Sequence, residues 1–339
     1  MQEPETAKKR GGLVSAVLAA VAGVFGAFLV LEIGTRLILD DGMNFDLEMW
    51  KYARDIKMMA DDEAIGHVHR PGSSGFYMGA GVAINSAGYR DREYDVAKPA
   101  SKVRIIMLGD SLTFGWGVEM EDTFADQLEK LLNGRAAAGR YEVINSGVGN
   151  YNTSMEVSAF LHTGQKFKPD IVVLNYFIND AEPTPKRKLN AFTEYSYAAV
   201  MLWGAADTVK RLYFGKPDWK TYYAGLYEDG QPGWSELKDA MAALADYCRS
   251  NGISLLMVNF PELHELRNYP FASATAKLAN VAASLAVPFH DTLPALDGEL
   301  PETLWVSPTD AHPNAKADAI FAAEIRNALR ANFPALITE

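Results

Sequence analysis

The sequence predicts a three-layer α/β fold, a doubly wound and mainly parallel sheet, preceded by an N-terminal transmembrane helix. Three observations lead to this prediction. Short apolar segments without polar alternation recur through residues 101–335, as buried parallel strands require. Segments with helical spacing of apolar residues separate these strands. Residues 11–31 form an uncharged run that is long enough to cross a bilayer.

Residues 1–40 are expected to form a cytoplasmic tip and a retained signal anchor. The basic residues Lys8-Lys9-Arg10 precede the apolar run, and basic flanks stay cytoplasmic. The protein is therefore predicted to be a single-pass protein of the cell inner membrane, with its main domain in the periplasm or outside the cell. The alternative is a cleaved signal peptide. The run exceeds the roughly 7 to 15 apolar residues of such peptides and reaches Glu32 without a small-x-small cleavage site.

Residues 41–100 are predicted to contain a small β-hairpin packed on the main domain. Val82 and Ile84 alternate with small residues, and Asn85-Ser-Ala-Gly88 has turn composition. The alternative for this segment is a substrate-binding surface.

The main domain should lie within residues 101–335. Strands are expected at residues 103–108, 142–146, 170–176, 253–260 and 287–290, with amphipathic helices between them. We expect Asp122 to cap the first of these helices, in which Phe124, Leu128, Leu131 and Leu132 recur at helical spacing and should face the core.

A serine nucleophile is predicted at Ser111. The apolar strand at residues 103–108 leads into a tight Gly109-Asp-Ser-Leu112 turn, which would lift the serine above the carboxyl edge of the sheet. A serine hydroxyl needs a base and an orienting carboxylate. His312 and Asp310 supply both residue types in a proline-rich loop near the C-terminus. A loop histidine beside a turn-forming aspartate is the structural alternative.

Four blocks in this order resemble the SGNH or GDSL-type hydrolase family. They are residues 109–112, 143–153, 172–180 and 310–312. The resemblance implies a flavodoxin-like strand order and a triad of Ser111, His312 and Asp310. It also implies an oxyanion hole formed by the N–H groups of Ser111 and Asn150 and by the side-chain amide of Asn179.

Three positions depart from the family pattern. Asn150 stands where the family has its oxyanion-hole glycine, and Gly149 would take that role if the register differed by one residue. Phe177 replaces the glycine before the third block's Asn-Asp. Asp310 and His312 are one residue closer than the commoner Asp-x-x-His spacing, which makes Asp310 the less secure triad member.

The resemblance implies an enzyme that hydrolyses ester bonds. We expect an esterase that removes a short acyl group, such as acetyl, from a carbohydrate or polysaccharide through an acyl-enzyme. The alternatives are an O-acyltransferase acting on cell-surface glycan, a lipase or lysophospholipase, and a non-catalytic glycan-binding module.

Residues 181–233 are expected to form an insertion or lid beside the Asn179 block. The insertion is rich in aromatic residues, and Trp219, Tyr222 and Tyr223 are candidates for a substrate rim. A helical subdomain with its own aromatic core, or a patch resting on the membrane, is the alternative. The Lys186-Arg-Lys188 cluster is expected to be a solvated face.

Composition excludes several classes of function. The net charge of −11 argues against a nucleic-acid partner, because such proteins need a positive face. The lone cysteine, Cys248, is expected to pack in the core. His67 and His69 lack a third nearby metal-binding residue, so no metal and no cofactor are expected.

Overall fold

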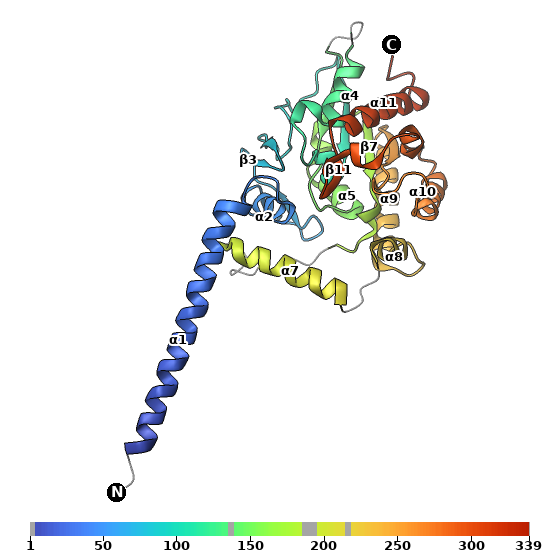
Figure 1. Ribbon diagram of the computed structural model, residues 1–339. Coiled ribbons are helices and arrows are strands. Elements are labelled where there is room, and N and C mark those ends of the chain that lie inside the picture. Colours follow the sequence, from blue (N-terminus) through green and yellow to red (C-terminus); the bar gives the residue numbers. More distant parts are fainter. Residues whose placement is uncertain (1–3, 135–138, 185–194, 214–217, 339) are drawn as a thin grey trace. The chain divides into compact units, whose positions relative to one another are not determined.

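A computed structural model describes residues 4–134, 139–184, 195–213 and 218–338. The chain forms two compact units (Figure 1). The helical unit comprises residues 1–50 and 189–215, and the sheet unit comprises residues 51–188 and 216–339. The Lys186–Lys188 cluster lies outside the described residues.

The sheet unit is built on a five-stranded parallel sheet, as predicted. The strands lie in the order β6-β5-β7-β8-β9, which is the doubly wound, flavodoxin-like order 2-1-3-4-5. Their bounds are β5 Val103–Leu108, β6 Tyr141–Asn145, β7 Ile171–Tyr176, β8 Ser254–Asn259 and β9 Phe289–Asp291. The predicted strands are therefore confirmed to within two residues.

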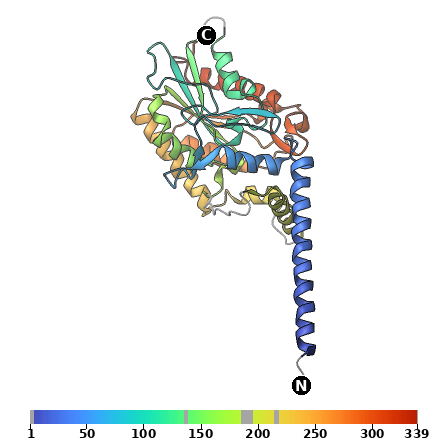
Figure 2. The same ribbon diagram turned by 90° about the vertical axis from the view of Figure 1, so that its left-hand side faces the viewer.

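Helices cover both faces of this sheet, which completes the predicted three layers (Figures 1 and 2). Every residue of β5 is buried: Ile105 and Met107 pack against one helical layer, and Ile106 and Leu108 against the other. This explains why the strand sequence does not alternate between apolar and polar residues. The first layer contains α4 Phe124–Leu132 and α11 Ala315–Asn332; the second contains α5 Thr153–His162, α9 Pro232–Ser250 and α10 Ala272–Ser284.

The start of α4 corrects one expectation. Thr123, not Asp122, caps this helix, because the Thr123 hydroxyl accepts the Asp126 N–H at 3.3 Å. Of the four predicted core residues of this helix, Leu131 is instead 38% exposed. Cys248 is buried on α9, as expected, and burial raises the pKa of its thiol to about 12.

Short elements complete the sheet unit. Among the described residues, three antiparallel strand pairs lie outside the main sheet: β1 Lys57–Met59 with β2 His67–His69, β3 Ser74–Tyr77 with β4 Ala80–Ala83, and β10 Trp305–Ser307 with β11 Asp310–Pro313. The short helices are α3 Ser111–Phe114, α8 Trp219–Gly225, and the 3₁₀ turns η2 Met120–Asp122, η3 Gly164–Phe167, η4 Ile178–Ala181, η5 Leu293–Leu296 and η6 Pro301–Thr303.

The helical unit contains one candidate membrane span among the described residues. Helix α1 (Pro4–Gly34) continues into the π-helical turn η1 (Thr35–Leu39), and residues 14–39 are long and apolar enough to cross a bilayer. Helix α7 (Tyr197–Tyr213) also belongs to this unit, whereas α2 (Phe45–Asp55) begins in it and ends in the sheet unit.

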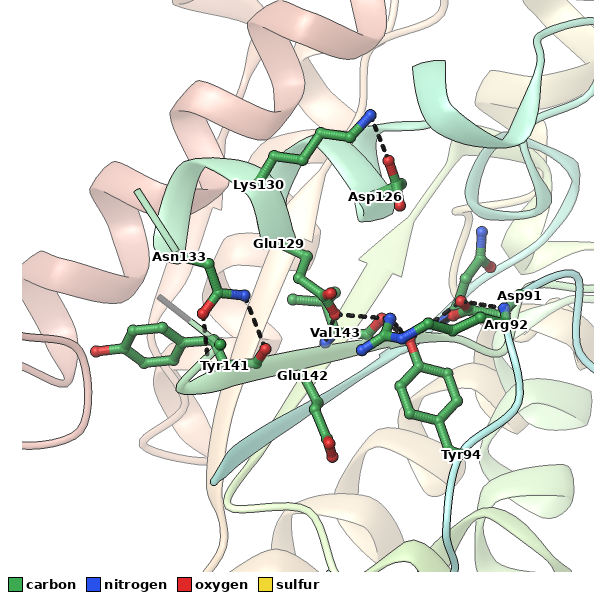
Figure 3. A network of polar contacts seen from close by, with 12 residues as sticks. Asp91, Arg92, Tyr94, Asp126, Glu129, Lys130, Asn133, Tyr141, Glu142 and Val143 are labelled. Carbon is green, nitrogen blue, oxygen red and sulfur yellow. Dashed lines mark hydrogen bonds and ion pairs between the residues drawn. The ribbon is translucent and has the colours of Figure 1, made fainter. Parts of the chain in front are cut away.

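At the free edge of strand β6, side chains accept hydrogen bonds from the main-chain N–H groups (Figure 3). The N–H groups of Tyr141, Val143 and Asn145 donate to the side chains of Asn133, Glu129 and Asp91, at 2.9, 2.8 and 2.8 Å. These three contacts occupy the hydrogen-bonding positions that another strand would use. Edge-to-edge pairing with a second chain is thereby blocked.

Asp91, which is partly buried, is a member of this edge network with a perturbed pKa. Burial raises the pKa of its carboxyl to about 7, although N–H groups of Asn145 and Arg92 act in the opposite direction. The Tyr94 hydroxyl lies 3.0 Å from Asp91 Oδ1 and donates to the Val143 carbonyl at 2.8 Å. With the Tyr94 proton directed at Val143, a protonated Asp91 can donate to the Tyr94 oxygen.

We predict that Asp91 makes folding stability depend on pH. A carboxyl whose folded pKa is raised favours the folded state below its unfolded pKa, and this contribution is lost as pH rises from about 4 through about 7. The full loss corresponds to about 4 kcal/mol in the free energy of unfolding. In Asp91→Asn this pH dependence should disappear. The unfolding free energy of the wild type minus that of the variant should therefore fall as pH rises from 5 to 8.

Thermal unfolding of the full-length chain in detergent at several pH values measures this effect. Asp126→Asn is the control, because Asp126 pairs with Lys130 at the surface of the neighbouring helix. A difference in unfolding free energy between the wild type and Asp91→Asn that stays constant with pH would contradict the raised pKa of Asp91.

Candidate functional site

Ser111 stands at the carboxyl end of β5, where the chain turns sharply into α3. A side chain at Gly109 would overlap Thr113, since a Cβ there would lie 1.9 Å from Thr113 Oγ1. Asp110 caps α3 by accepting the Leu112 N–H at 2.9 Å. The turn therefore needs glycine before Asp110 and places Ser111 at the first helical position.

The structure brings Ser111, His312 and Asp310 together. Ser111 Oγ lies 2.9 Å from His312 Nε2, and His312 Nδ1 lies 2.5 Å from Asp310 Oδ1. The His312 main-chain N–H also donates to Asp310 Oδ1 at 3.1 Å. The close Asp-x-His spacing therefore still allows this contact, because both residues lie on the short strand β11.

Trp116 holds the other oxygen of Asp310, which sequence analysis did not predict. Its indole N–H donates to Asp310 Oδ2 at 2.9 Å, and both side chains are buried. Burial by itself acts to raise the pKa of Asp310, but the His312 hydrogen bonds and charge, together with the Trp116 bond, leave that pKa below its usual value. Asp310 is thus held ionised beside the imidazole.

Asn179 lies beside the turn that contains Ser111. It follows β7 in the turn η4, and its amide Nδ2 donates to Asp110 Oδ2 at 3.3 Å. One N–H of the amide is used in this bond, and a second N–H is left on the same nitrogen. Because β5 and β7 are parallel neighbours, their carboxyl ends bring Asn179 next to the serine turn.

Asn150 lies in the loop after β6 and has a left-handed backbone, with φ of 64°. Asparagine tolerates this conformation better than most residues, which explains how it can stand at a position where glycine is expected. The N–H of the preceding Gly149 donates to the Tyr52 hydroxyl at 3.1 Å. That N–H is therefore engaged inside the protein.

Residues far upstream hold this loop, and sequence analysis missed them. Lys57 is buried, and its ammonium donates to the Gly149 carbonyl at 2.5 Å and to Asn150 Oδ1 at 2.9 Å. His67 Nε2 lies 3.1 Å from the same carbonyl. No local motif marks Lys57 or His67, because their partners lie 93 and 82 residues away.

The loop also packs directly on the serine turn. The Val148 N–H donates to the Gly109 carbonyl at 3.1 Å. A Cβ at Gly147 would lie 2.3 Å from the Phe114 main-chain nitrogen. The two main chains thus touch at a point where only glycine fits.

Two of the predicted rim residues are exposed on α8. Trp219 is 38% and Tyr222 is 43% exposed, whereas Tyr223 is partly buried against the core. The Tyr222 hydroxyl donates to Glu182 Oε1 at 3.1 Å, close in sequence to Asn179. The His264 ring contacts the rings of both Trp219 and Trp305. The centroid distances are 5.4 Å to Trp219 and 4.9 Å to Trp305.

The paired histidines of β2 have contacts within the protein. His69 Nε2 lies 2.6 Å from the Tyr52 hydroxyl, and burial, followed by the charge of Lys57, lowers the pKa of His69 to about 3. Within the described parts of the chain, no group of three or more potential metal-binding side chains is arranged to hold a metal ion.

Residues 107–320 match the family described as GDSL-like lipase/acylhydrolase. An uncharacterized protein of Mycoplasma pneumoniae (strain ATCC 29342 / M129 / Subtype 1) is 28% identical over 138 residues, which are 39% of this chain but 16% of that relative. The crystal structure of TesA has a TM-score of 0.44 at 15% identity and covers 67% of this chain and 98% of its own. Axe2, an acetylxylan esterase from Geobacillus stearothermophilus, has a TM-score of 0.46 at 14% identity, with coverages of 68% and 96%.

The packing of the loop on the serine turn leads to a prediction for Gly147→Ala. The added methyl group would meet main-chain atoms, which cannot rotate away, so we expect a loss of about 1 to 3 kcal/mol in unfolding free energy. Ester hydrolysis should fall with it, because the loop must shift relative to Ser111. Thermal unfolding and turnover are measured in parallel. Gly134→Ala is the matched control, since its nearest neighbour would be 3.8 Å away, and equal behaviour of both variants would contradict the prediction.

Proposed function

Because the chain belongs to the GDSL-like lipase/acylhydrolase family and is an ester-bond hydrolase, we propose a more specific function for it. We propose that it is a membrane-anchored, extracytoplasmic serine esterase. Its substrate would be a carbohydrate or polysaccharide bearing a short acyl group such as acetyl. The observation that supports this most is the hydrogen-bonded series Ser111, His312 and Asp310 at the carboxyl edge of the sheet.

In the proposed reaction, Ser111 Oγ attacks the ester carbonyl carbon while its proton passes to His312 Nε2. The carbonyl oxygen becomes an oxyanion, which accepts hydrogen bonds from the Ser111 and Asn150 N–H groups and the Asn179 amide. When the intermediate collapses, the alcohol leaves with the proton from His312. Water then attacks the acyl-enzyme by the same steps and restores Ser111. Asp310 orients the imidazole throughout.

We assign the second main-chain donor of the oxyanion hole to Asn150 rather than Gly149. The contact of the Gly149 N–H with Tyr52 supports this choice, because that N–H is already used. Lys57 would be a positioning residue, since it bonds both to the Gly149 carbonyl and to the Asn150 side chain.

Two features support a carbohydrate as the alcohol part of the substrate. Trp219, His264 and Trp305 form a partly exposed row of rings, and aromatic faces suit the apolar faces of sugar rings. A cavity of about 820 Å³ also reaches Asn150. Eight of its thirteen lining residues are polar or charged: Lys57, Glu63, His67, Asn150, Ser154, Ser158, Thr184 and Glu236.

The anchor and its orientation are proposed from the N-terminal sequence. Residues 14–31 contain no charged side chain, and the basic Lys8-Lys9-Arg10 precede them. This arrangement supports a cytoplasmic N-terminus, and the hydrolase would then lie outside the cytoplasm, at the inner membrane.

Hydrolysis of a p-nitrophenyl ester series by the full-length chain tests the proposed reaction. We expect turnover to fall steeply from acetyl to long acyl chains and to disappear in Ser111→Ala. Asn179→Ala should lower kcat by about 10² to 10³-fold, the usual effect of removing one oxyanion donor. Ser250→Ala, at an exposed serine at the end of α9, is the control and should behave as the wild type.

Activity that survives in Ser111→Ala would rule out this mechanism. A folded wild-type chain that is inactive on every ester in water, but active when a sugar alcohol is added, would favour the O-acyltransferase alternative.

The role of Lys57 is tested by Lys57→Met, which keeps the apolar stem but removes the ammonium. We expect kcat to fall by about 10²-fold with little change in KM, because a misplaced oxyanion donor affects the transition state more than substrate binding. Lys57→Arg keeps a donor and should recover part of the loss. Lys102→Met, at the amino end of β5, is the control, and an unchanged kcat in Lys57→Met would disprove the positioning role.

A further inference from the structure

Helix α7 begins at the end of the candidate membrane span. The Glu32 carboxylate accepts hydrogen bonds from the Ser196 hydroxyl at 2.9 Å and from the N–H groups of Tyr197 and Ala198 at 3.3 and 2.9 Å. The first N–H groups of a helix lack partners within it, and they carry its positive end. A carboxylate from α1 therefore caps α7.

Aromatic and charged contacts strengthen this junction. Arg36 bonds to Glu32 at 2.7 Å and lies over the Tyr197 ring, 4.3 Å from its centroid. Trp50 meets the same ring edge-on, with centroids 4.8 Å apart. Glu32 and Arg36 are the first charges after the uncharged run, where a spanning helix leaves the hydrocarbon region. If α1 spans a bilayer, these contacts hold the start of α7 at the level where α1 leaves the hydrocarbon region.

Within the helical unit, α7 runs sideways from the upper end of α1 and does not continue along its axis (Figure 1). A helix that leaves a membrane span in this direction extends along the surface of the bilayer. Its 17 residues correspond to about 25 Å of helix.

The two faces of α7 differ in what they contact. Gly204 faces α2, since a Cβ there would lie 3.0 Å from Asp46 Oδ2. Leu202 and Val209 lie on the other side of the helix at the spacing of one face, and they are 51% and 50% exposed. Trp203, at the border of this face, is 70% exposed. We call Leu202, Trp203, Ala206 and Val209 the apolar stripe.

We infer that α7 is an interfacial helix whose apolar stripe inserts into the bilayer beside α1. This inference rests on the proposed membrane anchoring. Leucine and valine gain from burial in the acyl region, and tryptophan favours the boundary between headgroups and acyl chains. Lys210 borders the stripe and is exposed, so its ammonium can reach the lipid phosphates while its stem stays in the apolar layer.

Fluorescence quenching in vesicles tests this inference. The full-length chain with Cys248→Ala receives one cysteine, labelled with the environment-sensitive fluorophore NBD, and is reconstituted in phosphatidylcholine and phosphatidylglycerol. Val209→Cys reports on the stripe, Ala206→Cys is a second stripe position, and exposed Thr208→Cys is the neighbouring control outside the stripe. Val24→Cys reports on α1. Each labelled protein must retain hydrolysis of a soluble ester, which shows that it is folded.

We expect nitroxide groups on the upper acyl chains to quench NBD at positions 24, 206 and 209 several-fold more than at position 208. Aqueous iodide should show the reverse order. Lipid quenching at position 24 with iodide quenching at 206 and 209 equal to that at 208 would overturn the interfacial helix and leave the anchor intact. Iodide access at position 24 would overturn the anchor itself and the inference with it.

Discussion

The site depends on the contact between two main chains, that of Gly147 and that of residues 113–114. It joins the loop after β6 to the turn after β5, two neighbouring parallel strands, without intervening side chains. Main-chain contacts are stiff, because neither partner can change rotamer. The proposed nucleophile Ser111 and the loop of the proposed oxyanion donor are consequently held at one fixed separation, and the other parts of the candidate site are arranged around this pair.

A second set of contacts reaches the site from outside the region that matches the family. Lys57 and His67 precede residue 107, yet both contact the Gly149 carbonyl. Arg90 is buried and donates to the carbonyls of Phe114 and Val118, next to the serine turn. Residues 51–100 are thus part of the sheet unit, and hydrogen bonds from this segment support the loops that follow β5 and β6.

Features that depend on neighbouring residues could be predicted from the sequence, whereas features that depend on residues far apart in the sequence could not. The five strands and the turn that holds Ser111 depend on local patterns, namely unbroken apolar runs and a position that requires glycine, so they are visible in the sequence. The predicted N-cap of α4, Asp122, was wrong by one residue. Asp122 and Thr123 are both good capping residues, and the backbone angles decide between them. Trp116 and Lys57 could not be predicted, because their partners lie 194 and 93 residues away and only the fold brings them together.

The left-handed backbone of Asn150 also has a consequence for conformational entropy. A glycine at this position would sample positive and negative φ about equally, and ordering it for catalysis would cost more entropy than ordering an asparagine. Asparagine restricts that freedom, and its side-chain oxygen is held by Lys57. The loop is therefore ordered when the protein folds rather than when substrate arrives. Binding free energy that would otherwise be spent on ordering the loop remains available for the substrate.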